Sequence, residues 1–395
     1  MNGRQRVAAA MRHEAADRVP VMCQLALGHY FIHGGRRPSD ILFDSPTCAA
    51  TLAEFRARYR FDGVLVNVPG RPAHWMDYLA SRETVAGGEV LRWKCGLETR
   101  VPPDDNAHTF DAQGGPLPRA DSHTVDIADP ATYRIPGYVW NTWHAPVLWD
   151  IPDDADLSSV DAYPDWFTLA LRCAREACPD SSVHVEVFSP FTHLLELFSY
   201  DQALMALVDI PDTCRHLLEV VTGHVVAQVR AYAPCRPDAV LISSAFAGAG
   251  FISRTMYREF VLPYETRVAD AIRSCGLPSY THTCGAIGDR LDLMAETGID
   301  GVDTLDPPPL GTVDLAQAKA DFGDRFFFKG NLDAVNEMLR ADDDAFEQAV
   351  RQRLDIGKPG GGYILSSACS VAPHVDPRRL SRLVALAEQF GRYDE

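Results

Sequence analysis

The sequence predicts a (β/α)8 TIM barrel, and three observations support this fold. Short apolar segments alternate with helical segments along much of the 395-residue chain, which is typical of a parallel sheet covered on both faces. The strand candidates number eight, as this barrel requires. Polar side chains gather at the C-terminal ends of these strands, where such barrels carry their active sites. An open doubly wound sheet is the alternative, but no glycine-rich phosphate loop follows the first strand.

The predicted elements begin with a charged helical segment, residues 2–14, which we expect to form an N-terminal helical extension. The first strand candidate is RVPVMCQL (18–25), and a helix is predicted over 47–60. Helices follow nearly all of the later strand candidates, and Pro263 is expected to break the helix that runs to Gly276. Those strand candidates are 62–68, 182–190, 239–246, 278–284, 301–307, 325–333 and 362–370.

Residues 70–160 interrupt this alternation. They are rich in Pro, Gly, Asp and Trp, and contain only short strand-like pieces such as EVLRWKC (89–95). We interpret them as an irregular insertion after the second strand, and expect residues 1–395 to form a single barrel domain. Because irregular loops on a rigid scaffold usually carry specificity, we expect the insertion to contact the substrate or a partner.

The composition excludes some classes of function. The chain has 37 basic and 54 acidic residues, a formal net charge of −17, so we expect it to bind neither nucleic acid nor anionic membranes. The first twenty residues lack the apolar core of a signal peptide, and no segment approaches the length of a membrane span, so we expect a cytoplasmic protein. The ten cysteines form no compact framework, which predicts reduced thiols that are available to a metal.

A candidate metal site lies in the segment THTCG (281–285). Residues i and i+2 of a strand face the same side, so His282 and Cys284 can both point into the mouth of the barrel. Cys369 stands at the corresponding end of the last strand candidate. Two thiolates and one imidazole suit Zn²⁺ and leave one coordination position open, as in catalytic zinc sites. The alternative is a hydrogen-bonded histidine beside two packed thiols.

Other polar residues near the strand ends are candidates for catalysis or substrate binding. Glu186 can serve as a fourth metal ligand or a base, and its structural alternative is a hydrogen-bonded strand carboxylate. Asp303 can orient the metal-bound histidine, and His374 can donate a proton or lie solvated in a loop. The candidate substrate-binding residues are Gln24, His29, Ser243 and Asn331.

Four segments together resemble the uroporphyrinogen decarboxylase superfamily over nearly the whole chain: DRVPV (17–21), THTCG (281–285), KGNLD (329–333) and ACS (368–370). In the decarboxylase itself, which is metal-free, a Gln-Ala-Gly-Arg run near the first strand grips substrate carboxylates. Here that region reads MCQLALGHYF (22–31) and lacks the arginine.

The resemblance is closer to the zinc-dependent branch, which includes methylcobalamin:coenzyme M methyltransferases and epoxyalkane:coenzyme M transferases. The His-x-Cys…Cys motif of that branch falls on His282, Cys284 and Cys369.

The resemblance implies zinc-dependent methyl or alkyl transfer to a small thiol. A thiol bound at the open zinc position loses its proton and attacks a methyl-corrinoid or similar alkyl donor. No Asp-x-His-x-x-Gly corrinoid motif is present, so methylcobalamin would be a free donor or be bound by a separate corrinoid protein. The alternatives are an epoxide-opening thiol transferase, a metal-free decarboxylase, and a barrel that binds a ligand without turnover. Neither the acceptor nor the oligomeric state follows from the sequence.

Overall fold

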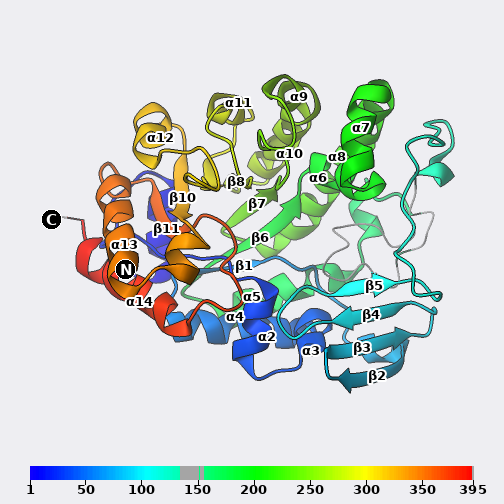
Figure 1. Ribbon diagram of the computed structural model, residues 1–395, viewed down its shortest axis with the longest axis horizontal. Coiled ribbons are helices and arrows are strands. Elements are labelled where there is room, and N and C mark those ends of the chain that lie inside the picture. Colours follow the sequence, from blue (N-terminus) through cyan, green and yellow to red (C-terminus); the bar gives the residue numbers. More distant parts are fainter. Residues whose placement is uncertain (134–150, 152–154, 394–395) are drawn as a thin grey trace.

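The computed structural model describes residues 1–133, 151 and 155–393. Its main feature is a sheet of seven parallel strands in the order β1-β6-β7-β8-β9-β10-β11, with helices around its outer side (Figure 1). Every residue of these strands is buried, which explains their apolar sequences. The strands are β1 (Gly63–Val66), β6 (Ser182–Phe188), β7 (Ala239–Ser243), β8 (Ser279–His282), β9 (Gly301–Thr304), β10 (Phe327–Leu332) and β11 (Tyr363–Ser367).

Seven of the predicted strands are thus confirmed, but the prediction for 18–25 was wrong in detail. This segment forms only isolated parallel bridges, Val21 to Leu365 and Leu25 to Val371. The backbone N–H of Asp62, just before β1, donates to the carbonyl of Val21. Pro20 has no N–H to contribute to a ladder, which accounts for the irregular pairing. The segment therefore contacts both edges of the seven-stranded sheet without being a regular strand.

Helices follow the strands as expected, and the predicted break near Pro263 separates α9 from α10 at Val261. Among the described residues, no helix is both long enough and apolar enough to cross a membrane. The helices are α1 (Gly3–Met11), α2 (Leu27–Gly34), α3 (Pro38–Phe43), α4 (Ser45–Tyr59), α5 (Leu169–Ala177), α6 (Pro190–Phe198), α7 (Tyr200–Asp209), α8 (Pro211–Tyr232), α9 (Arg254–Phe260), α10 (Leu262–Ser274), α11 (Leu291–Glu296), α12 (Leu315–Phe322), α13 (Asp343–Gly357) and α14 (Pro377–Phe390).

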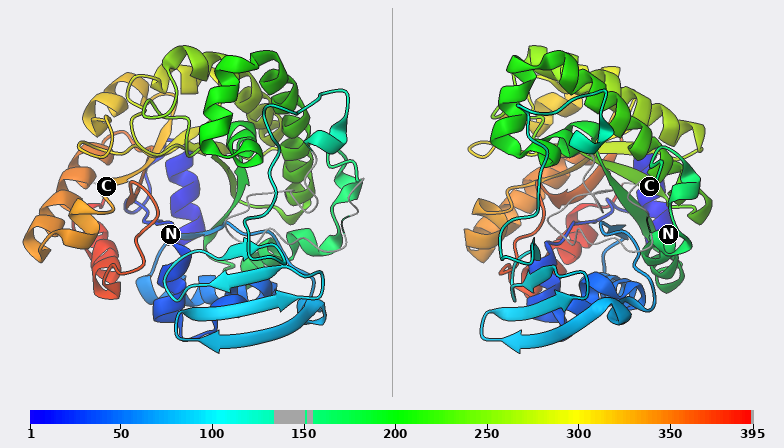
Figure 2. Two further views of the ribbon diagram at one scale, coloured as in Figure 1. Left: turned by 45° about the vertical axis from the view of Figure 1, so that its right-hand side comes forward. Right: turned by 90° about the vertical axis from the view of Figure 1, so that its right-hand side faces the viewer.

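Helix α1 covers the N-terminal ends of the parallel strands. Its residues Val7, Ala10 and Met11 belong to one apolar cluster with inward-facing strand residues. Arg4 pairs with Asp238, the residue immediately before β7. Figure 2 (left) shows this helix in the middle of the ring of strands and helices. The predicted N-terminal extension therefore closes one end of the apolar interior, and the other end carries the polar residues. The strand residues of the cluster are Leu65, Ala239, Leu241, Tyr280, Phe327 and Ile364.

The insertion is more regular than predicted. It contains a four-stranded antiparallel sheet in the order β2-β3-β4-β5, which lies beside the parallel sheet (Figure 1). Trp93 of β3 is buried, and its ring contacts Phe43 of α3 and Trp75. Residues 134–150 and 152–154 of the predicted insertion lie outside the described residues. The strands are β2 (Leu79–Val85), β3 (Gly88–Trp93), β4 (Glu98–Val101) and β5 (His108–Phe110).

Candidate metal centre

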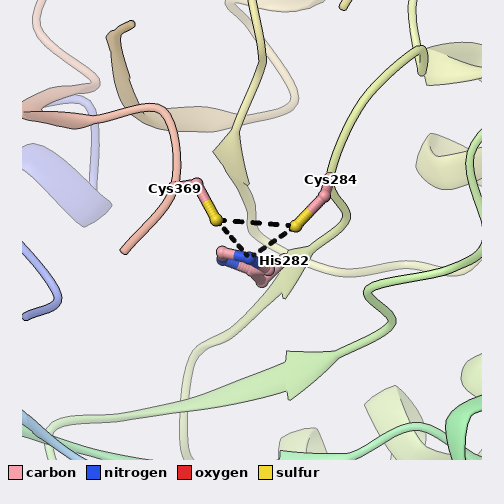
Figure 3. Close-up of side chains that lie close together, drawn as sticks. All are labelled: His282, Cys284 and Cys369. Atoms are coloured by element: carbon pink, nitrogen blue, oxygen red, sulfur yellow. Dashed lines mark hydrogen bonds between the residues drawn. The ribbon is translucent and has the colours of Figure 1, made fainter. Parts of the chain in front are cut away.

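The structure brings His282, Cys284 and Cys369 together at the C-terminal ends of β8 and β11 (Figure 3). His282 is the last residue of β8, and the two cysteines lie in the loops that follow their strands. The Nε2 atom of His282 is 3.3 Å from the Sγ atom of Cys284 and 3.9 Å from that of Cys369. The two sulfurs are 3.6 Å apart. Within the described part of the chain, this is the one group of metal-type ligands that converges.

These distances fit a tetrahedral zinc site. Bond lengths of about 2.3 Å to sulfur and about 2.05 Å to nitrogen place two sulfurs about 3.8 Å apart. The same bond lengths place sulfur and nitrogen about 3.6 Å apart. The three observed separations lie within about 0.3 Å of these values. His282 is buried and both cysteines are partly exposed, so the three residues fit a Zn²⁺ ion that they would hold at a partly accessible place.

The other nitrogen of the His282 ring contacts a buried network of hydrogen-bonded side chains. Its Nδ1 atom lies 3.2 Å from Oδ2 of Asp303 and 2.9 Å from Oγ1 of Thr304. Both oxygens of Asp303 accept from Nζ of Lys329, each at 3.0 Å. A carboxylate on the far nitrogen of a ligating histidine is the usual support of a zinc site. The predicted orienting role of Asp303 is therefore compatible with its position.

Hydrogen bonds link the pKa values of the two thiols and the imidazole. Cys284 donates a hydrogen bond that, together with His282, lowers the pKa of Cys369 well below its usual value. The same hydrogen bond and burial raise the pKa of Cys284. Burial disfavours the charged form of His282, but hydrogen bonds to Asp303 and Cys369 prevail and raise its pKa to about 10. A metal cation would take the place of these protons between the three ligands.

Glu186 and Ser243 lie beside this centre on β6 and β7. Burial raises the pKa of Glu186 to about 7, although the His282 charge and a hydrogen bond from Ser243 counteract the rise. The register places Ser243 opposite His282 on the neighbouring strand. Glu186 is thus a buried carboxyl group that can change its protonation near neutral pH, as an acid or base in catalysis must.

Two contacts fix the loop that carries Cys284. The backbone N–H of Gly285 donates to Oδ2 of Asp306 at 2.6 Å. Gly248, in the loop after β7, approaches so closely that an added Cβ would lie 2.8 Å from the carbonyl oxygen of Cys284. The position of this ligand therefore depends on the two neighbouring loops.

The structure does not bring the remaining predicted residues into this group. His29 is fully buried, and its two ring nitrogens bond to Tyr59 and to the carbonyl of Pro373. It fixes α2 against the C-terminal loop, so the prediction that it binds substrate is not supported. Asn331 donates to the carbonyl of Leu305 and accepts from Arg353, so its amide is also occupied inside the protein.

His374 and Gln24 have different surroundings. The imidazole of His374 is exposed and lies 3.1 Å from Asp104, which is the solvated loop alternative rather than a buried proton donor. The backbone of Gln24 pairs with Val371, and its side-chain oxygen is buried with no partner among the described residues. Gln24 therefore keeps its candidacy for substrate binding.

Lys329 and Thr304 were not predicted as site residues. Lys329 stands in the segment KGNLD (329–333), in which Asn331 was the predicted substrate-binding residue. The available signal was a single lysine within the apolar run of β10, because a buried charge requires a partner. Thr304 offered no such signal.

Comparisons with known proteins identify the family of the chain. Residues 142–390, more than half of the chain, match the family model described as uroporphyrinogen decarboxylase (URO-D). A uroporphyrinogen decarboxylase of Thioalkalivibrio sulfidiphilus is 30% identical over 189 residues, which cover 47% of this chain and 51% of that protein. Another, of Aromatoleum aromaticum, is 32% identical over 186 residues, covering 46% and 49%. The matched region thus spans about half the length of these relatives.

Solved structures share the fold over nearly the full length. A methyltransferase from Methanosarcina mazei superimposes with a TM-score of 0.69 at 16% identity, covering 99% of each chain. A B12-independent methionine synthase from Shewanella sp. W3-18-1 gives a TM-score of 0.51 at 10% identity, covering 94% of this chain and 97% of that one. At these identities the likeness concerns the fold alone. Through its family-model match, the chain belongs to the uroporphyrinogen decarboxylase family.

Proposed function

We propose that the protein is a zinc-dependent alkyltransferase, and specifically a methyltransferase, that acts on a thiol. The observation that carries this proposal is the convergence of His282, Cys284 and Cys369 at distances that fit three ligands of one tetrahedral zinc ion. One of the fold neighbours described above is named a methyltransferase, which agrees with the proposal.

The chain's own residues divide the chemistry among them. Bound here, Zn²⁺ would supply a Lewis acid that lowers the pKa of a coordinated thiol. His282, Cys284 and Cys369 would hold it, and the two thiolates would balance its charge, so that the acceptor sulfur would stay electron-rich. Glu186, whose pKa is about 7, accepts the proton that the acceptor thiol releases. Asp303 holds the far nitrogen of His282.

The proposal extends to the scaffold and the donor. Segment 18–25 bonds to β11 and to the residue before β1, so we infer that it closes the parallel sheet into a barrel within a single domain. The donor is methylcobalamin, either free or bound by a separate corrinoid protein. An epoxide-opening thiol transfer would use the same metal site.

A metal-free decarboxylase is the second candidate, because the curated relatives reported above are named uroporphyrinogen decarboxylase. Metal analysis of the purified protein distinguishes the two. We expect about one zinc per chain in the wild type and a large loss in Cys284→Ser and Cys369→Ser. Cys95→Ser is the matched control, because Cys95 is exposed and lies outside the ligand group. A folded wild type that takes up no zinc would refute the proposal.

Three activity assays complete the test. With the zinc-loaded protein, we expect a thiol to demethylate methylcobalamin. The absorption spectrum of the cobalamin monitors this reaction. If the protein adds the thiol to an epoxide and does not demethylate methylcobalamin, then the alkyl donor is an epoxide and not methylcobalamin. The proposed metal site would still stand. Release of carbon dioxide from uroporphyrinogen by the metal-free protein would favour the decarboxylase.

A further inference from the structure

We propose that Lys329 is a positioning residue of the metal centre. Acting through Asp303, it holds His282 with Nδ1 bonded inside the protein and Nε2 turned toward the two cysteines. This inference rests on the metal site of the proposed function. It adds a residue that touches none of the three ligands.

The register of the sheet places the three side chains at one level. His282 of β8 is the Cα partner of Asp303 on β9, and Asp303 is the partner of Lys329 on β10. The exposed fractions are 6% for His282 and 2% for each of the other two residues. Three neighbouring strands therefore carry a continuous row of side chains, from the buried ammonium group of Lys329 through Asp303 to the imidazole of His282.

The donor and acceptor groups of these three side chains determine which way each hydrogen bond runs. The ammonium group of Lys329 can only donate, and the carboxylate of Asp303 can only accept. Lys329 donates to both oxygens of Asp303 at 3.0 Å, and the backbone N–H of Thr304 donates to Oδ1 at 2.8 Å, so the carboxylate is held from two sides. Oδ2 then accepts from Nδ1 of His282, and Nε2 remains the nitrogen that faces the sulfurs. The Thr304 hydroxyl can donate or accept, so it cannot impose this orientation alone.

A purely structural ion pair is the competing explanation, and the chain contains one for comparison. Arg18 pairs with Asp62 at 2.7 Å, and both side chains are at least nine-tenths buried. Asp62 directly precedes β1, at the end of the sheet opposite the metal ligands. Removing the cation from either pair should destabilise the fold, but only Lys329 should affect metal binding.

The experiment measures the affinity of the folded full-length protein for Zn²⁺, by competition with a chromophoric chelator. The absorption spectrum of the Co²⁺-loaded protein reports the geometry of the ligands. We compare the wild type, Lys329→Met, Arg18→Met, and Asp303→Asn combined with Lys329→Met. Circular dichroism at low temperature confirms that each variant is folded.

We expect Lys329→Met to bind Zn²⁺ about 10–100-fold more weakly, as for other residues that support a metal ligand, and to alter the Co²⁺ spectrum. Arg18→Met should keep the affinity of the wild type. The double variant should bind more tightly than Lys329→Met, because the asparagine oxygen can accept from Nδ1 without a neighbouring cation. Unchanged affinity in Lys329→Met, equal loss in Arg18→Met, or no recovery in the double variant would overturn the inference. A wild type that binds no metal would overturn the proposed function as well, so the two failures are distinguishable.

Discussion

Glu265 of α10 provides a test of the electrostatics of the protein interior. Its side chain is 1% exposed, and burial raises its pKa from 4.5 to about 7, although hydrogen bonds with Ser244 and Tyr257 counteract part of the rise. Between these two values the folded protein keeps the proton and the unfolded chain loses it. The free energy of unfolding therefore falls as the pH rises through this range.

The magnitude follows from the size of the pKa change. At about 1.4 kcal/mol for each tenfold change in proton affinity, the full effect is about 3 kcal/mol. Replacing the acid by a neutral amide of the same shape removes this dependence. We expect Glu265→Gln to match the wild type near pH 5 and to exceed its free energy of unfolding by about 2–3 kcal/mol at pH 8.

Urea denaturation of both proteins across pH 5–8 measures the difference. Glu296→Gln is the control, because its side chain is 48% exposed and lies on the surface of α11; its difference from the wild type should change little with pH. If wild type and Glu265→Gln show parallel pH profiles, burial does not raise the pKa of this group and the reasoning fails.

Two further predictions concern the ends of the sheet. Arg18→Met removes the nearer cation from the buried Asp62, while Arg6 stays 3.1 Å from its Oδ1. It should lower the free energy of unfolding by less than the about 3–5 kcal/mol that a fully unpaired buried charge costs and leave the zinc content unchanged, as denaturation and metal analysis of the same samples would show. Gly248→Ala places a Cβ 2.8 Å from the carbonyl oxygen of Cys284 and should weaken Zn²⁺ binding in a chelator competition. Gly250→Ala is its control, because nothing lies within 4 Å of the added atom; equal affinities in the two variants would contradict the prediction.

The sequence predicted the parts of the fold that depend on local pattern. Buried parallel strands have long apolar runs, so seven strands were located from their composition. Segment 18–25 was assigned as a full strand because its apolar run resembles the others. Pro20 has no N–H to donate to a neighbouring strand, and this loss matters only once the partner strands are known. The β2–β5 sheet was foreseen only as strand-like pieces such as 89–95, because its strands are partly exposed and lack the continuous apolar runs of the parallel strands.

In the candidate site too, the residues that local spacing identifies were predicted, and those that depend on contacts between distant segments were not. His282 and Cys284 were identified because residues two apart on a strand face the same side. Cys369 was identified because it stands at the end of another predicted strand. Lys329 was missed because its pairing with Asp303 depends on the register of β9 against β10, which no local spacing encodes. His29 was selected for its place after the first strand, but its bonds to Tyr59 and Pro373 come from distant segments.

The apolar contacts of α1 have a consequence for the order of binding. Because Val7, Ala10 and Met11 fill the interior at the N-terminal ends of the described strands, a small molecule would reach His282, Cys284 and Cys369 from the opposite end. In the proposed reaction, the thiol and the alkyl donor would share that entrance. The thiol, which binds deeper, must therefore enter before a bulky donor covers it, and the alkylated product can leave only after the spent donor has gone. Initial-rate kinetics should accordingly show a compulsory order, with the thiol first.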